Sequence, residues 1–135
     1  MKQLFATAAL AAATLSTPAF AAPETYVLDA GHSQIVFSYN HLGFSTTYGM
    51  FSGFEGDIAF DAENPAASSV SVSMPVKSML TGWEKRTGHF MSPDFFNAQD
   101  GDLVTFTSTA IEVTGDNTAN ITGDLTMNGV TKAVV

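Results

Sequence analysis

The sequence predicts an all-β protein built on antiparallel sheet, with one short helical segment between two of its strands. Three observations lead to this prediction. Large apolar residues alternate with small or polar ones over several runs, which is the period of a strand with one buried and one solvated face. Asn, Asp and Gly residues, which are typical of tight turns, separate these runs. One long stretch, residues 78–97, lacks the alternation.

The first two predicted strands cover residues 25–28 and 33–41. In the second of them Ile35, Phe37 and Tyr39 occupy every other position and therefore share one face. Strands that are apolar on one face only are typical of antiparallel sheet, because parallel strands are usually buried on both faces.

A longer strand is predicted over residues 48–61, with Ile58 on its apolar face. Its alternation breaks once, because three positions instead of two separate Phe51 from Phe54. Gly53 lies in this gap, which indicates a β-bulge or a sharp bend of the kind that curls a sheet into a barrel.

Three further strands are predicted over residues 69–76, 103–113 and 119–127. The pair Asn128-Gly129 follows the last of these and predicts a two-residue type I′ hairpin turn. A seventh strand then begins at Thr131.

The stretch without alternation is predicted to be a crossing loop with one or two short helices. Ser92, Pro93 and Asp94 have the chemistry of a helix start, with a cap, a proline in the first turn and an acid near the positive end of the dipole. We place this helical excursion near residues 83–97.

Residues 1–21 have the three zones of a secretory signal peptide. Lys2 supplies a positive charge, an Ala- and Leu-rich stretch follows, and the small residues Ala19 and Ala21 suit signal peptidase. We predict cleavage after Ala21, which leaves residues 22–135 as one domain. We expect no later segment to span a bilayer as a helix.

The composition excludes several classes of protein. Thirteen Asp and Glu residues stand against five Lys and Arg, so the chain lacks the basic patches that neutralise nucleic-acid phosphates. The absence of cysteine from an exported domain means that packing and strand pairing alone must hold the fold.

The histidines and one short polar cluster are the candidates for chemistry. His32, His41 and His89 lie far apart on different elements, whereas a zinc site needs three or four ligands at suggestive spacing. Asp29, His32 and Ser33 are close together, but no nucleophile elbow accompanies them. We therefore predict no catalytic residue and no metal site, and interpret the Asp29 cluster as a capped turn.

The aromatic content permits two interpretations. Eleven Phe, three Tyr and one Trp can fill a core, or they can line a dry pocket inside a barrel. Composition alone leaves the choice between a filled core and a lipid pocket open.

Six stretches occur in the order found in one known family. They are residues 26–41, 49–61, 85–89, 92–96, 104–109 and 123–132, which include Tyr26-Val27-Leu28-Asp29, Phe54-Glu55-Gly56-Asp57, Lys85-Arg86 with His89, Ser92-Pro93-Asp94-Phe95-Phe96, Val104-Thr105-Phe106-Thr107 and Asn128-Gly129-Val130-Thr131-Lys132. Together they cover nearly all of the chain after the export signal. The sequence thus resembles the YceI-like family of periplasmic polyisoprenoid-binding proteins.

The resemblance implies a lipocalin-like antiparallel barrel of eight strands with a helical excursion near residues 83–97. It implies a periplasmic binding or carrier protein, not an enzyme, that holds an isoprenoid quinone or a polyprenyl chain inside the barrel. No cofactor other than this lipid is implied, and a homodimer is compatible with the resemblance. Because the family continues past the turn at 128–129, we expect this chain to be C-terminally truncated.

Alternation then assigns the side chains that line the lipid pocket. The predicted lining residues are Ile35, Phe37, Tyr39, Phe54, Ile58, Phe60, Val72, Met74, Phe106, Ile121 and Leu125, with Trp83, Phe90 and Phe96 closing one end. A slip of one residue in any strand would turn its whole set to the other face.

Two alternatives stay open from the sequence. One is a periplasmic module that uses its histidines for a metal or a haem-associated redox role. The other is a stress-response interaction protein with a filled core and no ligand.

Overall fold

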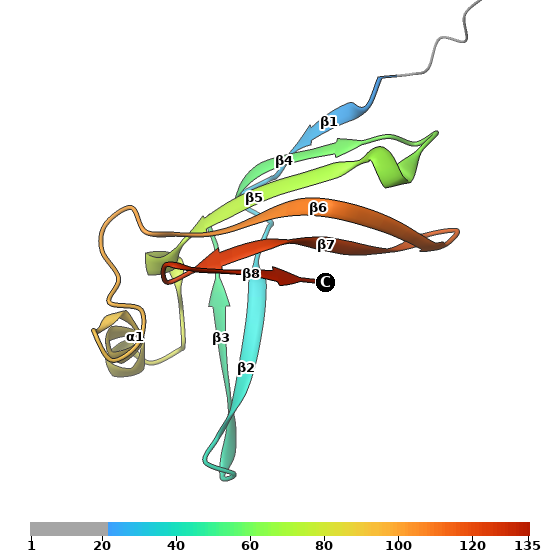
Figure 1. Ribbon diagram of the computed structural model, residues 1–135. Coiled ribbons are helices and arrows are strands. Elements are labelled where there is room, and N and C mark those ends of the chain that lie inside the picture. The colour runs from blue at the N-terminus through green and yellow to red at the C-terminus, as the bar shows by residue number, and fades with distance from the viewer. Residues whose placement is uncertain (1–21) are drawn as a thin grey trace, which may run out of the picture.

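The computed structural model describes residues 22–135 (Figure 1). The predicted export signal, residues 1–21 with its cleavage after Ala21, lies outside the described residues. The described part is mostly β, with one α-helix and two short 3-10 helices, η1 (Pro65–Ala67) and η2 (Val76–Ser78). The prediction of an all-β protein with a short helical excursion is confirmed.

A six-stranded antiparallel sheet forms the larger part of the structure. Its strands follow the order β1-β4-β5-β6-β7-β8, so every pair of neighbours is consecutive in the chain except β1 and β4, which are separated by the two strands of the other sheet. The strands are β1 (Glu24–Val27), β4 (Glu55–Phe60), β5 (Ser69–Pro75), β6 (Leu103–Gly115), β7 (Thr118–Met127) and β8 (Val130–Val134).

The register places apolar and polar side chains on opposite faces of this sheet. Val72 is paired with Phe106, and Phe106 with Leu125, so the three lie across neighbouring strands on one face. One position earlier or later, Ser71 is paired with Thr107 on the other face. The alternation in the sequence therefore predicted the faces of the sheet correctly.

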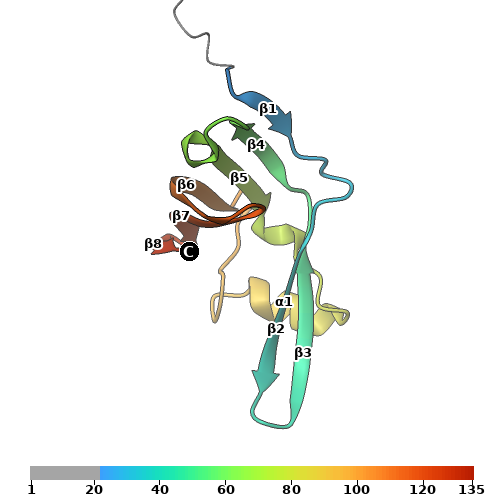
Figure 2. The same cartoon turned by 90° about the vertical axis from the view of Figure 1, so that its right-hand side faces the viewer.

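The strands β2 (Ile35–His41) and β3 (Ser45–Phe51) form a separate antiparallel hairpin. Figures 1 and 2 show this hairpin extending away from the six-stranded sheet, with α1 (Glu84–Met91) beside it. Met50 forms an isolated bridge to Leu80, with N–H···O distances of 2.8 Å in both directions. This bridge ties the segment before α1 to β3.

The prediction of one continuous strand over residues 48–61 is wrong. The chain makes a bend at residues 52–54, where Gly53 has a φ of +68°, and this conformation interrupts the ladder. On one side β3 pairs only with β2, and on the other β4 pairs with β1 and β5. The bend itself was predicted; the transfer of the chain to a second sheet was not.

The predicted helix start at Ser92 is also wrong. Ser92 follows the last residue of α1, and its N–H and hydroxyl both donate to the carbonyl oxygen of His89. The next residues fold back on the end of the helix, since Phe96 N–H donates to Phe90 O and Ala98 N–H to Met91 O. These bonds satisfy the free carbonyls of α1 and leave no new helix to begin.

The turn between β7 and β8 is the predicted one. Asn128 and Gly129 have φ values of +51° and +72°, the signs that a type I′ turn requires at both central positions. The hydroxyls of Thr126 and Thr131 are 2.8 Å apart across the second pair from the turn.

The hydrophobic core is small and lies where the sheet, the hairpin and the α1 segment meet. Its buried side chains are Phe51, Phe54, Met74, Val76, Met79 and Val104. The half-buried hydrophobic residues packed against them are Leu28, Phe37, Phe90, Met91, Phe96, Ala98 and Leu125. The core therefore joins the two sheets instead of filling the space within one closed barrel.

The barrel is not closed within residues 22–135. In this part of the chain β1 and β8 each pair with one strand only, and no ladder joins either of them to the β2–β3 hairpin. The apolar face of the six-stranded sheet is consequently open along much of its length, and Phe60 keeps 43% of its surface exposed.

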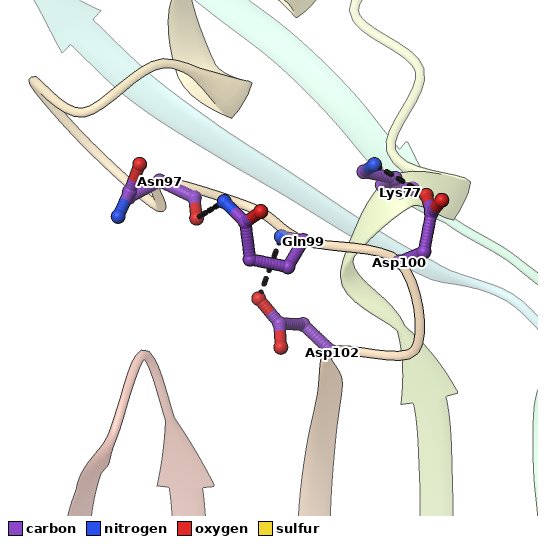
Figure 3. Close-up of polar contacts among 5 residues, drawn as sticks. All are labelled: Lys77, Asn97, Gln99, Asp100 and Asp102. Atoms are coloured by element: carbon purple, nitrogen blue, oxygen red, sulfur yellow. Dashed lines mark hydrogen bonds and ion pairs between the residues drawn. The ribbon is translucent and has the colours of Figure 1, made fainter.

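The loop between α1 and β6 is held by polar contacts (Figure 3). Gln99 N–H donates to Asp102 Oδ2 at 2.8 Å, and the Gln99 side-chain amide donates to Asn97 O at 2.8 Å. Lys77 Nζ, on η2, lies 2.6 Å from Asp100 Oδ1. The loop is thus fixed both internally and to the end of β5.

The Lys77–Asp100 pair predicts a pH effect. The hydrogen bond from Lys77, together with its charge, lowers the pKa of the Asp100 carboxyl below its ordinary value of 3.8. The stabilisation from the Lys77–Asp100 pair is therefore complete at pH values above 3.8 and disappears as the pH falls through the lowered pKa of Asp100. Carboxyl-carbon NMR titration should show the low pKa in the wild type and a return to the ordinary range in Lys77→Ala, whereas Lys132→Ala should leave Asp100 unchanged.

The hairpin predicts a steric effect. Gly49 lies directly across from Phe37, whose ring covers it, so a Cβ at this position would overlap ring atoms. We expect Gly49→Ala to lower the free energy of unfolding by about 1–3 kcal/mol, measured by urea denaturation. Gly88→Ala is the matched control: it lies in α1 with no neighbour in reach and should stabilise by up to about 1 kcal/mol. Equal effects of the two changes would contradict the close packing at Gly49.

Candidate functional site

A cavity lies between α1 and the β2–β3 hairpin, and we name it the helix–hairpin cleft. It has a volume of about 750 Å³. It is lined by Tyr39, His41, Ser45, Thr47, Trp83, Lys85, Arg86, His89, Phe90 and Phe95. A cavity of this size falls in the range that small-molecule sites occupy.

A buried polar cluster holds the wall of the cleft that α1 provides. Thr81 is only 5% exposed, and its hydroxyl donates to Trp83 O at 3.1 Å and lies 2.9 Å from Thr87 Oγ1. Arg86 Nη2 donates to Thr81 O at 2.7 Å. Because the neighbouring Leu80 bridges to β3, these contacts fix the first turn of α1 against the hairpin.

Aromatic rings cover the apolar part of the cleft. Tyr39 of the hairpin meets Phe90 of α1 edge to face, with ring centroids 5.9 Å apart. Phe90 also meets Phe95 at 5.0 Å, and the ring of His89 meets Phe95 at 4.9 Å. Such edge-to-face pairs add to the stabilisation from burial alone.

The apolar wall continues from the cleft into the core. Phe90 packs against the core cluster, as do Phe37 and Phe96. The ring centroid of Phe51, a member of the cluster, lies 6.5 Å from that of Phe96 and 5.5 Å from that of Phe37. Leu125 of the six-stranded sheet packs against the same cluster. A continuous set of apolar side chains therefore leads from the cleft to the open face of the sheet.

The structure brings the predicted lining residues together in three groups. Seven lie on the apolar face of the six-stranded sheet or enter the core from it: Phe54, Ile58, Phe60, Val72, Met74, Phe106 and Leu125. Ile121 belongs to the same face, across from Ile111. Ile35, Phe37 and Tyr39 share one face of β2, and Trp83, Phe90 and Phe96 come from the α1 segment. Their role in lipid binding stays a prediction.

Burial divides the same residues differently. Phe54 and Met74 are buried in the core, whereas Ile35 and Trp83 are 46% and 58% exposed. Tyr39, Trp83 and Phe90 are the predicted residues that line the helix–hairpin cleft.

The polar side chains of the cleft were not predicted as site residues. His41 had a signal in the sequence, since it shares the parity of Ile35, Phe37 and Tyr39. Lys85 and Arg86 lie in the predicted helical excursion, and the alternation that assigned the strands carries no information about which side a helical residue faces.

The third histidine lies elsewhere. His32 Nδ1 is 2.8 Å from Asp29 Oδ2, while Gly31 N–H donates to Asp29 Oδ1 at 2.9 Å, which is the capped turn that the sequence predicts. The hydrogen bond with His32 is the main cause that lowers the pKa of the Asp29 carboxyl. Within residues 22–135 no group of three or more His, Asp or Glu side chains is placed to hold a metal ion.

None of the helices of residues 22–135 is long and apolar enough to cross a membrane.

The strand order, the inward apolar face and the cleft beside it define a lipocalin-like antiparallel barrel, open in the described part of the chain. The sequence model of the YceI-like domain matches residues 26–135, and the chain belongs to this family. The resemblance found in the sequence is thereby confirmed.

Relatives of known sequence support the same family. A UPF0312 protein of Ectopseudomonas mendocina is 42% identical over 135 residues, which is all of this chain and 71% of the relative. A UPF0312 protein of Shewanella baltica is 41% identical over 133 residues, 97% of this chain and 69% of the relative.

Solved structures show the same fold. BcnA of Burkholderia cenocepacia has a TM-score of 0.67 and 29% identity over 75% of this chain. The YCEI protein of Campylobacter jejuni has a TM-score of 0.61 and 31% identity over 81% of this chain. The present chain spans 64% of the length of each of these two structures.

The buried polar cluster at Thr81 predicts how the cleft responds to substitution. Thr81→Val keeps the volume but removes the hydroxyl that links Trp83 O with Thr87. We expect the free energy of unfolding to fall by about 1–2 kcal/mol. Urea denaturation monitored by the fluorescence of Trp83 measures this change. Thr114→Val is the control, since its hydroxyl bonds to Thr118 at an exposed position, and it should change stability by less than about 0.5 kcal/mol. A Thr81→Val variant as stable as this control would contradict the structural role of the cluster.

Proposed function

We propose that the protein is a periplasmic carrier that binds a polyisoprenoid lipid, either an isoprenoid quinone or a polyprenyl chain. The lipid tail lies along the apolar face of the six-stranded sheet and reaches the helix–hairpin cleft. The family membership supports this proposal, together with the continuous apolar wall between the two places. The predicted export signal over residues 1–21 supports the periplasmic location.

The observation that carries the proposal is the exposure of large apolar side chains on one face. The apolar face keeps Phe60 and Tyr26, which is paired with Ile58, 43% and 50% exposed. Contiguous apolar surface of this kind marks a binding site in a soluble protein. The opposite face of the same strands carries Ser71 and Thr107.

The energetics favour a long hydrocarbon ligand. Burying one five-carbon isoprene unit contributes on the order of 4 kcal/mol, at about 0.8 kcal/mol for each carbon. Association costs roughly 4–15 kcal/mol in lost translational and rotational freedom. Several isoprene units are therefore needed before binding becomes favourable, and an extended apolar face is long enough to accept them.

Mass spectrometry tests the proposal directly. The full-length protein is purified from the periplasm of its own organism, extracted with organic solvent, and its lipids are identified and counted. We expect one polyprenyl species near one molecule per chain. Folded protein whose extract contains no lipid would contradict the proposal and favour a ligand-free interaction role.

A pair of neighbouring substitutions locates the lipid on the sheet. Phe106→Asp puts a charge on the apolar face, where an apolar tail cannot solvate it, so we expect the extract to lose its lipid. Thr107→Asp is the matched control, since it adds the same charge at the next position on the polar face of β6. Circular dichroism checks that both variants are folded. Equal lipid content in the two folded variants would refute the assigned face.

A further inference from the structure

The turn between β2 and β3 exposes two large apolar side chains. Leu42 and Phe44 are 78% and 88% exposed, and neither belongs to the core cluster or to the residues packed against it. We name residues 42–44 the tip loop. Figures 1 and 2 show it at the end of the hairpin farthest from the six-stranded sheet, and it projects beyond α1 in both views. Folding therefore gains little from the apolar character of these two side chains.

The backbone of Leu42 makes a leucine at this position more unusual. Leu42 and Gly43 have φ values of +54° and +81°, and Phe44 N–H donates to His41 O at 3.0 Å across them. Such a turn prefers Asn, Asp or Gly at its first central position, because a bulky side chain is strained with a left-handed backbone. A leucine that is both strained and exposed indicates a role outside the fold.

The hairpin differs in charge from the rest of the molecule. The chain has a formal net charge of −8, yet all thirteen Asp and Glu residues and all five Lys and Arg residues lie outside residues 30–54. This range includes β2, the tip loop and β3. The hairpin can therefore enter the boundary between lipid headgroups and acyl chains without carrying an acid, a lysine or an arginine out of water.

The tip loop also satisfies the demand that a bilayer makes on backbone groups, which must keep their hydrogen bonds in an apolar phase. Gly43 N–H donates to Asn40 Oδ1, and Phe44 N–H donates to His41 O. Tyr48, three pairs behind the last pair of the hairpin, is 63% exposed. Its amphipathic ring suits the level of the headgroups, where tyrosine is enriched.

From these observations we infer that the tip loop docks the protein on the surface of a lipid bilayer. Leu42 and Phe44 enter the boundary between headgroups and acyl chains, while the acidic sheet stays in water. The partner is a bilayer and not a protein surface, because three residues at the end of a hairpin cannot bury the roughly 1,000 Å² that a stable protein interface needs. Docking goes beyond the proposed carrier function, since it requires no isoprenoid in the bilayer.

The position of the helix–hairpin cleft relates docking to that function. His41 and Ser45, the pair that closes the tip loop, both line the cleft. Docking therefore brings one end of the cleft to the bilayer surface. A lipid that passes between bilayer and protein then meets the apolar wall at Tyr39 and Phe90 directly. This consequence rests on the proposed function, whereas docking itself does not.

Vesicle co-sedimentation tests the inference with lipids that contain no isoprenoid. Full-length protein is mixed with vesicles of phosphatidylcholine alone or with vesicles that also contain phosphatidylglycerol, and the bound fraction is measured against lipid concentration. We expect binding to the neutral vesicles that changes little with sodium chloride, because burial of apolar side chains drives it. Binding to the anionic vesicles should be weaker, most clearly at low salt, because the net charge of the protein is negative.

Substitutions in the tip loop separate docking from folding. Phe44→Ser should weaken binding to phosphatidylcholine vesicles by roughly tenfold, because the apolar area that enters the bilayer is lost. Leu42→Asn should weaken binding by roughly threefold or more and should also raise the urea midpoint of unfolding, since asparagine suits the left-handed backbone. Val27→Ser is the matched control: this valine is also 78% exposed, but it lies on β1, and its loss should leave binding unchanged.

Three results would overturn the inference. Wild-type protein that binds neither kind of vesicle would remove docking, and the lipid extract would still decide the proposed function separately. Tip-loop variants that bind as tightly as Val27→Ser would place the contact elsewhere on the molecule. A wild-type dimer that Phe44→Ser converts to a monomer, measured by size-exclusion chromatography, would assign the tip loop to a contact between copies of the chain. Because Leu42→Asn should be at least as stable as the wild type, its loss of binding would not reflect unfolding.

Discussion

Gly53 has a left-handed backbone between two buried phenylalanines, and the position of the hairpin follows from it. Phe51 ends β3 and Phe54 precedes β4, and each is 6% exposed in the same core cluster. The chain therefore changes direction without either side chain leaving the core. A residue with a Cβ would adopt this conformation only under strain. The hairpin, α1 beside it and the cleft between them all depend on this change of direction.

The core serves a second purpose besides stability. Phe51 and Phe37 come from the hairpin, Met74 and Val104 from the sheet, and Phe96 from the loop after α1. Because one small cluster unites three parts of the fold, the wall of the cleft and the apolar face of the sheet form one surface. An extended ligand can then follow this surface without crossing a polar barrier.

The sequence predicted the elements better than their arrangement. Alternation located β5 and β7 to within one residue at each end, and Asn128-Gly129 predicted the turn to β8. The same period runs on both sides of Gly53, however, and a period carries no information about which sheet a strand joins. This is why residues 48–61 were predicted to be one strand.

The sequence assigned residues to the cleft by two different arguments. Tyr39 was placed on an apolar face because it alternates with Ile35 and Phe37, whereas Phe90 lies in the stretch without alternation and was assigned to one end of the predicted pocket. Lys85 and Arg86 look alike in sequence whether a helix presents them to water or to a cavity. The decision between these environments comes from contacts distant in sequence, such as the bridge between Met50 and Leu80.

The order of the strands along the chain has a consequence for the evolution of such a protein. The strands β4 to β8 pair in sequence order, and Leu28 N–H, just after β1, donates to Gly56 O of β4 at 3.0 Å. The chain thus leaves the sheet beside the point where it returns, and the hairpin is an insertion between two adjoining strands. Outside the residues that enter the core, such as Phe37 and Phe51, the hairpin shares no ladder with the sheet, so mutations there leave the strand pairing of the sheet untouched. Relatives with the same scaffold can therefore diverge in this one hairpin, while the sheet is inherited unaltered.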